Sequence, residues 1–277
     1  MNLRFALKIK AWLNYFISAH TFHQVDSPFV FGFCQTVIEN TDHLVEQESI
    51  EKLRKELLSD NAVFNRIDLG AGPVRGSQSR QSISQFIQQS SVKPNDGKLL
   101  NRMARFWNPS IILELGTAGG ISGAYWLAGR PQSILKTIEG DPVVAALARN
   151  NFNRLGLSSA EVIEGNFETV LPGLLDQLKS IDLVFIDGHH TGEALMRYIG
   201  IISPYINPHH GILVLDDIHW SRDMSSAWEK LRSNPDWPLS IDLFQLGLLI
   251  KNPDLIRHES IALIAARFKP WILGLFR

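Results

Sequence analysis

Hydrophobic residues recur along the chain with two different spacings. Up to about residue 97 they lie three and four positions apart, as expected for amphipathic helices, at 3–17, 29–40, 43–58 and 83–90. Beyond residue 97, short runs rich in Leu, Ile and Val alternate with helical segments, which is typical of parallel strands joined by helices. The predicted strands are 111–115, 135–139, 160–164, 183–186 and 212–215, and the predicted helices between them are 122–128, 142–155, 167–178 and 192–202.

Turn-forming residues place a boundary between these two regions. The segment 93–97, Lys-Pro-Asn-Asp-Gly, has the composition of a turn. We therefore expect an N-terminal helical region at 1–97 and an α/β domain at 98–277. Near the end of that domain, the runs 240–244 and 246–250 are too close in sequence for a crossover helix, so we expect them to pair antiparallel. The predicted fold class is α/β, a doubly wound and mostly parallel sheet with an N-terminal helical region.

Length and composition agree with a globular chain of this kind. The 277 residues suit one large domain or a domain with a smaller attachment, and 45% of them are hydrophobic and 20% charged. The formal net charge is -1 and is balanced in both regions, which argues against a nucleic-acid partner. The one cysteine, Cys34, fits a reducing compartment, and we see neither a membrane span nor a signal peptide. We expect a soluble, cytoplasmic protein without a membrane partner; its oligomeric state stays open, and a dimer is compatible with these observations.

A glycine-rich turn follows the predicted strand 111–115. The segment 116–123 reads Gly-Thr-Ala-Gly-Gly-Ile-Ser-Gly and leads into a predicted helix. In an open α/β sheet, ligands bind at the carboxyl ends of the strands, and glycines let the backbone approach a ligand closely. Glu139 ends the next strand, where such folds place an acid that accepts hydrogen bonds from ribose hydroxyls. The candidate cofactor residues in this part of the chain are Glu114, Gly116, Thr117, Ala118, Gly120, Ser122 and Glu139.

Two classes of cofactor use a turn of this type. A dinucleotide site is expected to have the pattern Gly-x-Gly-x-x-Gly, but the frame 118–123 lacks the first glycine and the frame from Gly116 lacks the second. The segment 114–122, Glu-Leu-Gly-Thr-x-x-Gly-x-Ser, instead resembles the first motif of class I S-adenosylmethionine-dependent methyltransferases. Glu139 is similar in position to the ribose-binding acid of that family.

The resemblance extends from about residue 97 to 250 and is to the small-molecule O-methyltransferases related to catechol O-methyltransferase. Glu-Gly-Asn-Phe-Glu at 164–168 resembles their third-strand motif, whose following residues border the adenine. The segment 181–190 resembles their fourth strand, which ends in an acid, and 211–217 resembles the fifth. The resemblance implies a Rossmann-like sheet of seven strands in the order 3-2-1-4-5-7-6, with S-adenosyl-L-methionine as the cofactor. It adds four residues to the cofactor candidates, namely Gly165, Asn166, Phe167 and Asp187.

A second glycine cluster, Gly-Ala-Gly at 70–72, resembles the same first motif locally. Only a short apolar pair precedes it, and the positions 88–91, where an acid would be expected, read Gln-Gln-Ser-Ser. This cluster is either the cofactor loop or a turn before the helix 83–90, and we favour the turn.

Three acids follow the predicted strands 183–186 and 212–215. We expect Asp187, Asp216 and Asp217 at one edge of the sheet, because the carboxyl ends of neighbouring parallel strands meet there. Oxygen ligands of this kind suit Mg2+ or another divalent cation. The catechol-type family has Asp, Asp and Asn at the corresponding places, so Asp217 departs from its pattern. The three acids therefore either bind a metal, or cap turns, contact the sulfonium side of the cofactor or orient the acceptor.

Methyl transfer to a hydroxyl also needs a base that removes the proton of the hydroxyl. The resemblance aligns the family's catalytic lysine with His190, and histidine titrates near neutral pH. His190 is therefore the first candidate and His189 the second, with Asp187 completing the catalytic set; the alternative for the two histidines is a polar helix start. His219 and Trp220 are candidates for the acceptor pocket, where the alternative for Trp220 is core packing.

The sequence thus predicts an S-adenosylmethionine-dependent methyltransferase that acts on an oxygen of a small-molecule acceptor, with metal assistance left open. The helical region 1–97 is expected to serve as a lid or as a wall of the acceptor site, because such a transfer depends on alignment and on the exclusion of water. The alternatives are an NAD-dependent oxidoreductase and a non-catalytic cofactor-binding protein, which share the same fold class.

Overall fold

The computed structural model describes residues 3–42, 46–68, 77–252 and 258–269. The chain forms two compact units that interleave along the sequence. Unit 1 comprises Met1–Thr41, His190–Met196 and Asn207–Arg277, and unit 2 comprises Asp42–His189 and Arg197–Ile206. No described helix is both long enough and apolar enough to cross a membrane.

Four parallel strands form the centre of unit 2, in the spatial order β6-β3-β4-β5. They are β3 (Ile111–Leu115), β4 (Ile134–Glu139), β5 (Ala160–Glu164) and β6 (Leu183–Ile186). Leu115 lies opposite both Ile138 and Ile186, and Glu139 lies opposite Glu164. The carboxyl ends of the four strands therefore share one edge, as the predicted order within this group requires. The crossover helices are α6 (Ile121–Gly129), α7 (Pro142–Arg154), α8 (Phe167–Leu178) and α9 (Gly192–Ile202), the last of which spans both units.

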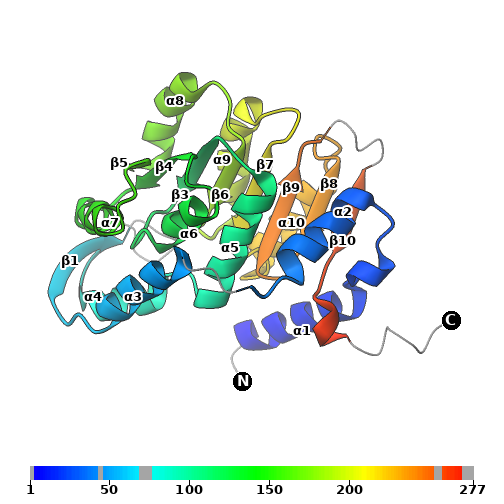
Figure 1. The fold of residues 1–277 in the computed structure, drawn as a ribbon, viewed down its shortest axis with the longest axis horizontal. Helices are drawn as coiled ribbons and strands as arrows, with labels where there is room; N and C mark the ends of the chain where they lie inside the picture. Colours follow the sequence, from blue (N-terminus) through cyan, green and yellow to red (C-terminus); the bar gives the residue numbers. More distant parts are fainter. Residues whose placement is uncertain (1–2, 43–45, 69–76, 253–257, 270–277) are drawn as a thin grey trace. The chain divides into compact units, whose positions relative to one another are not determined.

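The remaining elements of unit 2 come before β3. They are α3 (Glu46–Leu58), the antiparallel hairpin of β1 (Val63–Asp68) and β2 (Ser77–Ser82), α4 (Ile83–Ser90) and α5 (Pro94–Trp107) (Figure 1). The hairpin was not expected from the sequence. The glycine cluster at 70–72, for which we favour a turn, lies outside the described residues.

The prediction of a turn at 93–97 is wrong, because Pro94 begins α5 and the segment is the start of a helix. Proline is well suited to the first turn of a helix, where its missing N–H is not needed. Gly97 lies within this helix against the ring of Tyr125 in α6, where an added Cβ would lie 2.2 Å from a ring carbon. Glycine at this position therefore serves close packing of α5 on α6. The predicted boundary near residue 97 falls inside a helix, and a division of roles between 1–97 and 98–277 stays a prediction.

Unit 1 contributes four further strands in the order β10-β8-β9-β7. They are β7 (Ile212–Asp216), β8 (Leu239–Asp242), β9 (Leu246–Ile250) and β10 (Glu259–Ala262). The expected antiparallel pairing of β8 with β9 is confirmed, and β10 runs parallel to β8. The sheet is mostly parallel and flanked by helices, as predicted, but it has eight strands because β10 adds one to the expected seven.

Helices of unit 1 come from both ends of the chain. The first is α1 (Leu3–Ser18), and α2 (Pro28–Phe33) continues as a π-helical turn, η2 (Cys34–Ile38). α10 (Arg222–Arg232) follows β7 and buries Trp228. Four residues of this helix are buried at helical spacing, namely Met224, Ala227, Trp228 and Leu231. Short 3-10 helices of unit 1 lie at Phe22–Gln24 and Ala266–Phe268, and a third, Ser203–Tyr205, belongs to unit 2.

Candidate active site

The glycine-rich turn after β3 has a backbone that ordinary residues adopt only with strain. Gly116 has φ 99° and Gly120 has φ 75°, both in the region that favours glycine. A Cβ added to Gly116 would lie 2.5 Å from the carbonyl oxygen of Asp187, so the chain after β6 passes directly against this turn. Glycine at position 116 therefore lets the backbone of Asp187 pack directly against the turn between β3 and α6.

Glu139 is fixed beside this turn by two backbone donors. Ala118 N donates to Oε2 of Glu139 at 3.0 Å, and Asp141 N donates to Oε1 at 3.0 Å. Burial raises the pKa of Glu139, while the two N–H donors lower it. Each carboxylate oxygen keeps a further lone pair, so the group can accept hydrogen bonds from a ligand with neighbouring hydroxyls.

Asp141 links the same region to the β1–β2 hairpin. Its Oδ1 accepts from Val143 N at 2.8 Å and so caps α7, as the sequence pattern Asp-Pro suggests for a helix start. Its Oδ2 accepts from Ile67 N of β1 at 2.5 Å. The hairpin is thus hydrogen-bonded to the residue that also positions Glu139.

Glu114 faces the interior of unit 2. Ser122 Oγ donates to its Oε1 and Thr137 Oγ1 to its Oε2, each at 2.6 Å, and Thr117 Oγ1 lies 2.6 Å from Thr137 Oγ1. Burial raises the pKa of Glu114 to about 7, against the lowering effect of the two hydroxyls. These contacts place Glu114, Ser122 and Thr117 behind the glycine turn, where they support its shape; direct contact with a cofactor stays a prediction.

The candidates after β5 and β6 lie at the same edge of unit 2. Gly165 N donates to the carbonyl of Glu139 at 2.9 Å, and Asn166 caps α8 by accepting from Glu168 N at 2.9 Å. The ring of Phe167 meets the ring of His189 edge to face, with centroids 6.3 Å apart. His189 Nδ1 is hydrogen-bonded to the hydroxyl of Tyr198 at 2.8 Å.

Unit 1 holds the acids that follow β7. The side-chain amide of Gln245 donates to Asp217 Oδ1 at 2.8 Å and to Asp216 Oδ1 at 3.5 Å. Asp217 has φ 53°, and its Oδ2 lies 4.0 Å from His190 Nδ1. The structure therefore links Asp216 and Asp217 through Gln245, which sequence reasoning did not single out, and brings His190 near Asp217. Among the described residues, no group of three or more His, Cys, Asp or Glu side chains is arranged to hold a metal ion.

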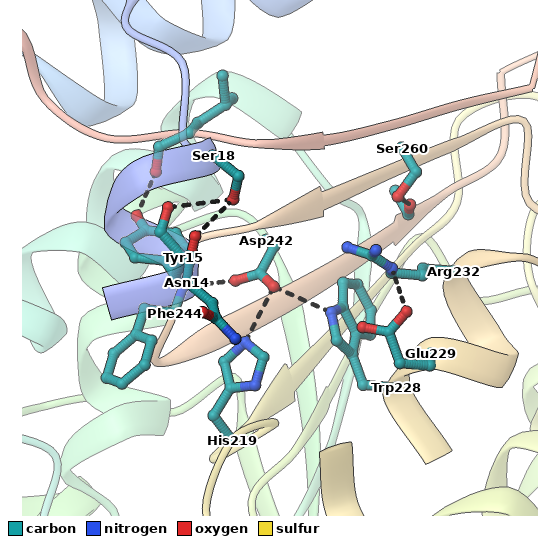
Figure 2. A network of polar contacts seen from close by, with 12 residues as sticks. Asn14, Tyr15, Ser18, His219, Trp228, Glu229, Arg232, Asp242, Phe244 and Ser260 are labelled. Carbon is teal, nitrogen blue, oxygen red and sulfur yellow. Dashed lines mark hydrogen bonds and ion pairs between the residues drawn. The ribbon is translucent and has the colours of Figure 1, made fainter. Parts of the chain in front are cut away.

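A second histidine and acid pair joins the loop after β7, which carries His219, to Asp242 at the end of β8. His219 Nε2 lies 2.9 Å from Asp242 Oδ2, and Trp228 Nε1 donates to the same oxygen at 3.1 Å (Figure 2). Asp242 was missed from the sequence, although a lone acid inside the apolar run 239–243 is itself a signal of a buried, partnered carboxylate. The helical spacing of the apolar residues in α10 would likewise have indicated that Trp228 faces inward.

Trp220 is half exposed, at 49%, so core packing does not account for it. The ammonium group of Lys8 lies 5.0 Å from its ring centroid. Trp220 thus offers an aromatic face next to His219, and its role in an acceptor pocket stays a prediction.

Comparison with known proteins identifies relatives of the chain. Residues 113–218 match a family described as a methyltransferase domain. An O-methyltransferase from Mycobacterium leprae (strain TN) is 32% identical over 161 residues, which cover 52% of this chain and 71% of that protein. The catechol O-methyltransferase of Niastella koreensis is 38% identical over 100 residues, covering 35% of this chain and 45% of that protein. The chain spans 47% of another relative, from Mycobacterium sp. (strain JLS), and so about half the length of several curated relatives.

Solved structures share the fold. The O-methyltransferase TomG from Streptomyces achromogenes, determined in complex with S-adenosylmethionine, has a TM-score of 0.55 at 18% identity, with 80% of this chain and 94% of that chain covered. At this level of identity the likeness concerns the fold alone.

Proposed function

The chain belongs to the O-methyltransferase family, and from that premise we propose that it transfers the methyl group of S-adenosylmethionine to an oxygen of a small molecule. The observation that carries the proposal is that two backbone N–H groups fix the carboxylate of Glu139 beside the glycine-rich turn of unit 2. An acid at this position recognises the two hydroxyls of a ribose. The evenly balanced charge of the chain favours a small acceptor over a nucleic acid.

The residues of unit 2 fit such a cofactor. At Gly116 there is no space for a side chain, so the backbone itself forms the wall of the turn. We propose that Gly116, Ala118 and Gly120 border the amino-acid part of the cofactor, that Glu139 accepts from its ribose, and that Gly165 to Phe167 border its adenine. Asp187, half-buried at the end of β6, lies at the same strand edge.

When bound, S-adenosylmethionine supplies an electrophilic methyl group on a positively charged sulfur. The residues of the chain then have to hold the acceptor oxygen in line with that methyl group, take up the proton of its hydroxyl and exclude water. We propose that Asp216 and Asp217 take part in orienting the acceptor, because Gln245 fixes both carboxylates at the end of β7. His190 and His189 are the base candidates from the sequence, and His189 is already hydrogen-bonded to Tyr198.

Metal assistance does not follow from the geometry of unit 1. The side-chain amide of Gln245 donates to Oδ1 of both Asp216 and Asp217, and within the described part of the chain no group of three or more His, Cys, Asp or Glu side chains is arranged to hold a metal ion. A magnesium ion at these acids stays a prediction from the sequence, and no step of the proposed reaction depends on it.

Calorimetric titration with S-adenosylhomocysteine tests the cofactor assignment. We expect the wild-type chain to bind it and Glu139→Ala to bind at least about ten-fold more weakly, because two charge-assisted hydrogen bonds are lost. Glu139→Gln, which keeps the shape of the side chain, should also bind more weakly.

The matched control is Glu161→Ala on β5, which removes an exposed acid that pairs with Lys136 and should leave binding unchanged. Thermal melting of each variant checks that the fold is intact. Absence of binding by the wild-type chain at millimolar ligand would overturn the proposal, and stabilisation by NAD alone would favour the oxidoreductase alternative.

A further inference from the structure

We propose that His219 is the general base that takes the proton from the acceptor hydroxyl, with Asp242 as the residue that positions its ring. The proposal rests on the methyl transfer proposed above and names the group that completes it. Its evidence lies entirely within unit 1, where both residues belong to one hydrogen-bonded network (Figure 2).

Asp242 is buried and fully engaged by donors. It is 5% exposed, its Oδ1 accepts from Phe244 N at 2.7 Å, and its Oδ2 accepts from Trp228 Nε1 at 3.1 Å. His219 Nε2, at 2.9 Å, is the third partner. Because a carboxylate can only accept, Nε2 of His219 carries the hydrogen in this bond. The neutral ring therefore has its free lone pair on Nδ1.

The ring of His219 is held in place on two sides. It stacks on the ring of Phe244 with centroids 5.3 Å apart and 26° between the planes, which opposes rotation away from Asp242. Its side chain is 13% exposed, and Nδ1 makes no hydrogen bond with any described residue. A histidine with one nitrogen bound to an acid and the other open has the arrangement of a general base and its orienting group.

The position of His219 in the fold agrees with this role. It lies three residues after Asp216, on the loop at the carboxyl end of β7, and ligands of open α/β sheets bind at such ends. The neighbouring Trp220 presents a half-exposed aromatic face. His190, by contrast, lies 4.0 Å from Asp217, whose other oxygen already accepts from Gln245. His219 is therefore closer to Asp242 than His190 is to Asp217.

The charged group in contact with His219 is Asp242. Asp216 ends β7 and Asp217 follows it, three and two residues before His219, and Tyr15 of α1 packs against Phe244 with ring centroids 5.4 Å apart. Burial, and then the negative charge of Asp242, raises the pKa of the Tyr15 hydroxyl, which stays neutral and donates to the carbonyl of Leu263. The network around His219 thus contains the carboxylate of Asp242 and the neutral hydroxyl of Tyr15.

The proposed step is balanced as follows. The O–H bond of the acceptor breaks, its proton moves to Nδ1 of His219, and the oxygen uses the freed electron pair to bond the methyl carbon. The bond between that carbon and the sulfonium sulfur breaks at the same time, with its electron pair left on sulfur. The proton later leaves the imidazolium for solvent. No metal or redox partner is needed.

The contribution of His219 to catalysis is measured with catechol as the methyl acceptor, using the release of S-adenosylhomocysteine as the readout. We expect His219→Ala to lower kcat by roughly 100-fold or more, as for loss of a general base, while the Kd for S-adenosylhomocysteine stays within about two-fold. Added imidazole should restore part of the rate in this variant. Asp242→Asn should move the acidic limb of the pH profile, which a purely structural residue would not do.

The matched control is His209→Gln, which removes an exposed histidine of the loop before β7 and should leave the rate unchanged. A His219→Ala variant that is folded, binds S-adenosylhomocysteine and keeps the wild-type rate and pH profile would overturn this proposal and leave the methyltransferase assignment standing. A wild-type chain that binds no S-adenosylhomocysteine would instead overturn the assignment on which the proposal rests.

Nitrogen NMR of the histidine rings tests the proposal without any acceptor. The His219 signals, assigned by their loss in His219→Ala, should show hydrogen on Nε2 and none on Nδ1 above the titration of the ring. Hydrogen on Nδ1 in the neutral ring would remove the proposed lone pair and overturn the proposal, even if catechol itself is not an acceptor.

Discussion

Three buried or half-buried carboxylates, in the two units of the chain, are each held in place by two or more hydrogen-bond donors. Glu139 accepts from two backbone N–H groups, Glu114 from two hydroxyls, and Asp242 from an N–H, an indole and an imidazole. Only Glu139 and Glu114 were singled out from the sequence, because each belongs to the strand and turn pattern that the sequence shows. Asp242 was not ranked that way, since only Phe244 among its donors is near it in the chain, and the side chains of Trp228 and His219 lie 14 and 23 positions away.

Glu114 makes the stability of unit 2 depend on pH. Its pKa is about 7 in the folded chain, above the ordinary value of 4.5, so the folded state holds the proton more tightly than the unfolded state. Stability is then greatest below about pH 4.5 and falls as the pH rises to about 7, by up to roughly 3 kcal/mol from this group. Above pH 7 its contribution no longer changes.

Glu114→Gln should remove this dependence, because the amide stays neutral and the hydroxyls of Ser122 and Thr137 can reorient to pair with it. Urea unfolding of wild type and variant at pH 5 and pH 8 measures the difference. We expect the free energy of unfolding of Glu114→Gln, relative to that of the wild type, to be higher at pH 8 than at pH 5. An equal difference at both pH values, with Glu161→Gln as the exposed control, would contradict the assignment.

At the scale of elements, β3 and the turn into α6 depend on glycine at one position above all. Gly116→Ala places a Cβ 2.5 Å from the carbonyl oxygen of Asp187 at φ 99°. We expect a loss of roughly 2–4 kcal/mol in unfolding free energy, and weaker binding of S-adenosylhomocysteine by the molecules that remain folded. Thermal and urea unfolding measure the first effect and calorimetry the second.

The control for this substitution is Gly200→Ala in α9. Gly200 is exposed within the helix, and an added Cβ would meet no atom within 4 Å. Alanine should therefore stabilise the chain by up to about 1 kcal/mol through its helix propensity. An equal free energy of unfolding for Gly116→Ala and Gly200→Ala would show that the backbone of the turn is not constrained as described.

Elements with a clear hydrophobic period were predictable, and polar elements were not. The bounds of β3, β5, β6, β9, α8 and α9 agree with the sequence, because their apolar positions follow the period of the element. Strand β2, Ser-Gln-Ser-Arg-Gln-Ser, has no apolar position, and its strand conformation comes from pairing with β1, which no local pattern reports. In α5, Pro94 and Gly97 have the composition of a turn but serve helix initiation and packing against Tyr125.

At the scale of the whole molecule, the sequence predicts the fold class, and the structure shows which segments of the chain form each of the two units. The N-terminal residues up to 41 belong with the strands β7 to β10, while residues 42–189 and 197–206 form the unit that contains the strands β3 to β6. Unit 1 is assembled from three separate segments, and such an assembly leaves no composition change at one point of the sequence; the division of roles between 1–97 and 98–277 stays a prediction. The acids and histidines of the candidate acceptor side lie in unit 1, and the glycine turn and Glu139 lie in unit 2.

We propose that the chain transfers a methyl group from S-adenosylmethionine to oxygen. This reaction can be followed by incubating the chain with S-adenosylmethionine labelled with 13C in its methyl group and a panel of hydroxylated aromatic molecules including catechol. We expect a product that carries the label, with the 13C chemical shift of a methyl bound to oxygen, and one S-adenosylhomocysteine formed per labelled product. Label found on nitrogen or carbon, or transfer to no member of the panel by a chain that binds the cofactor, would overturn the proposal.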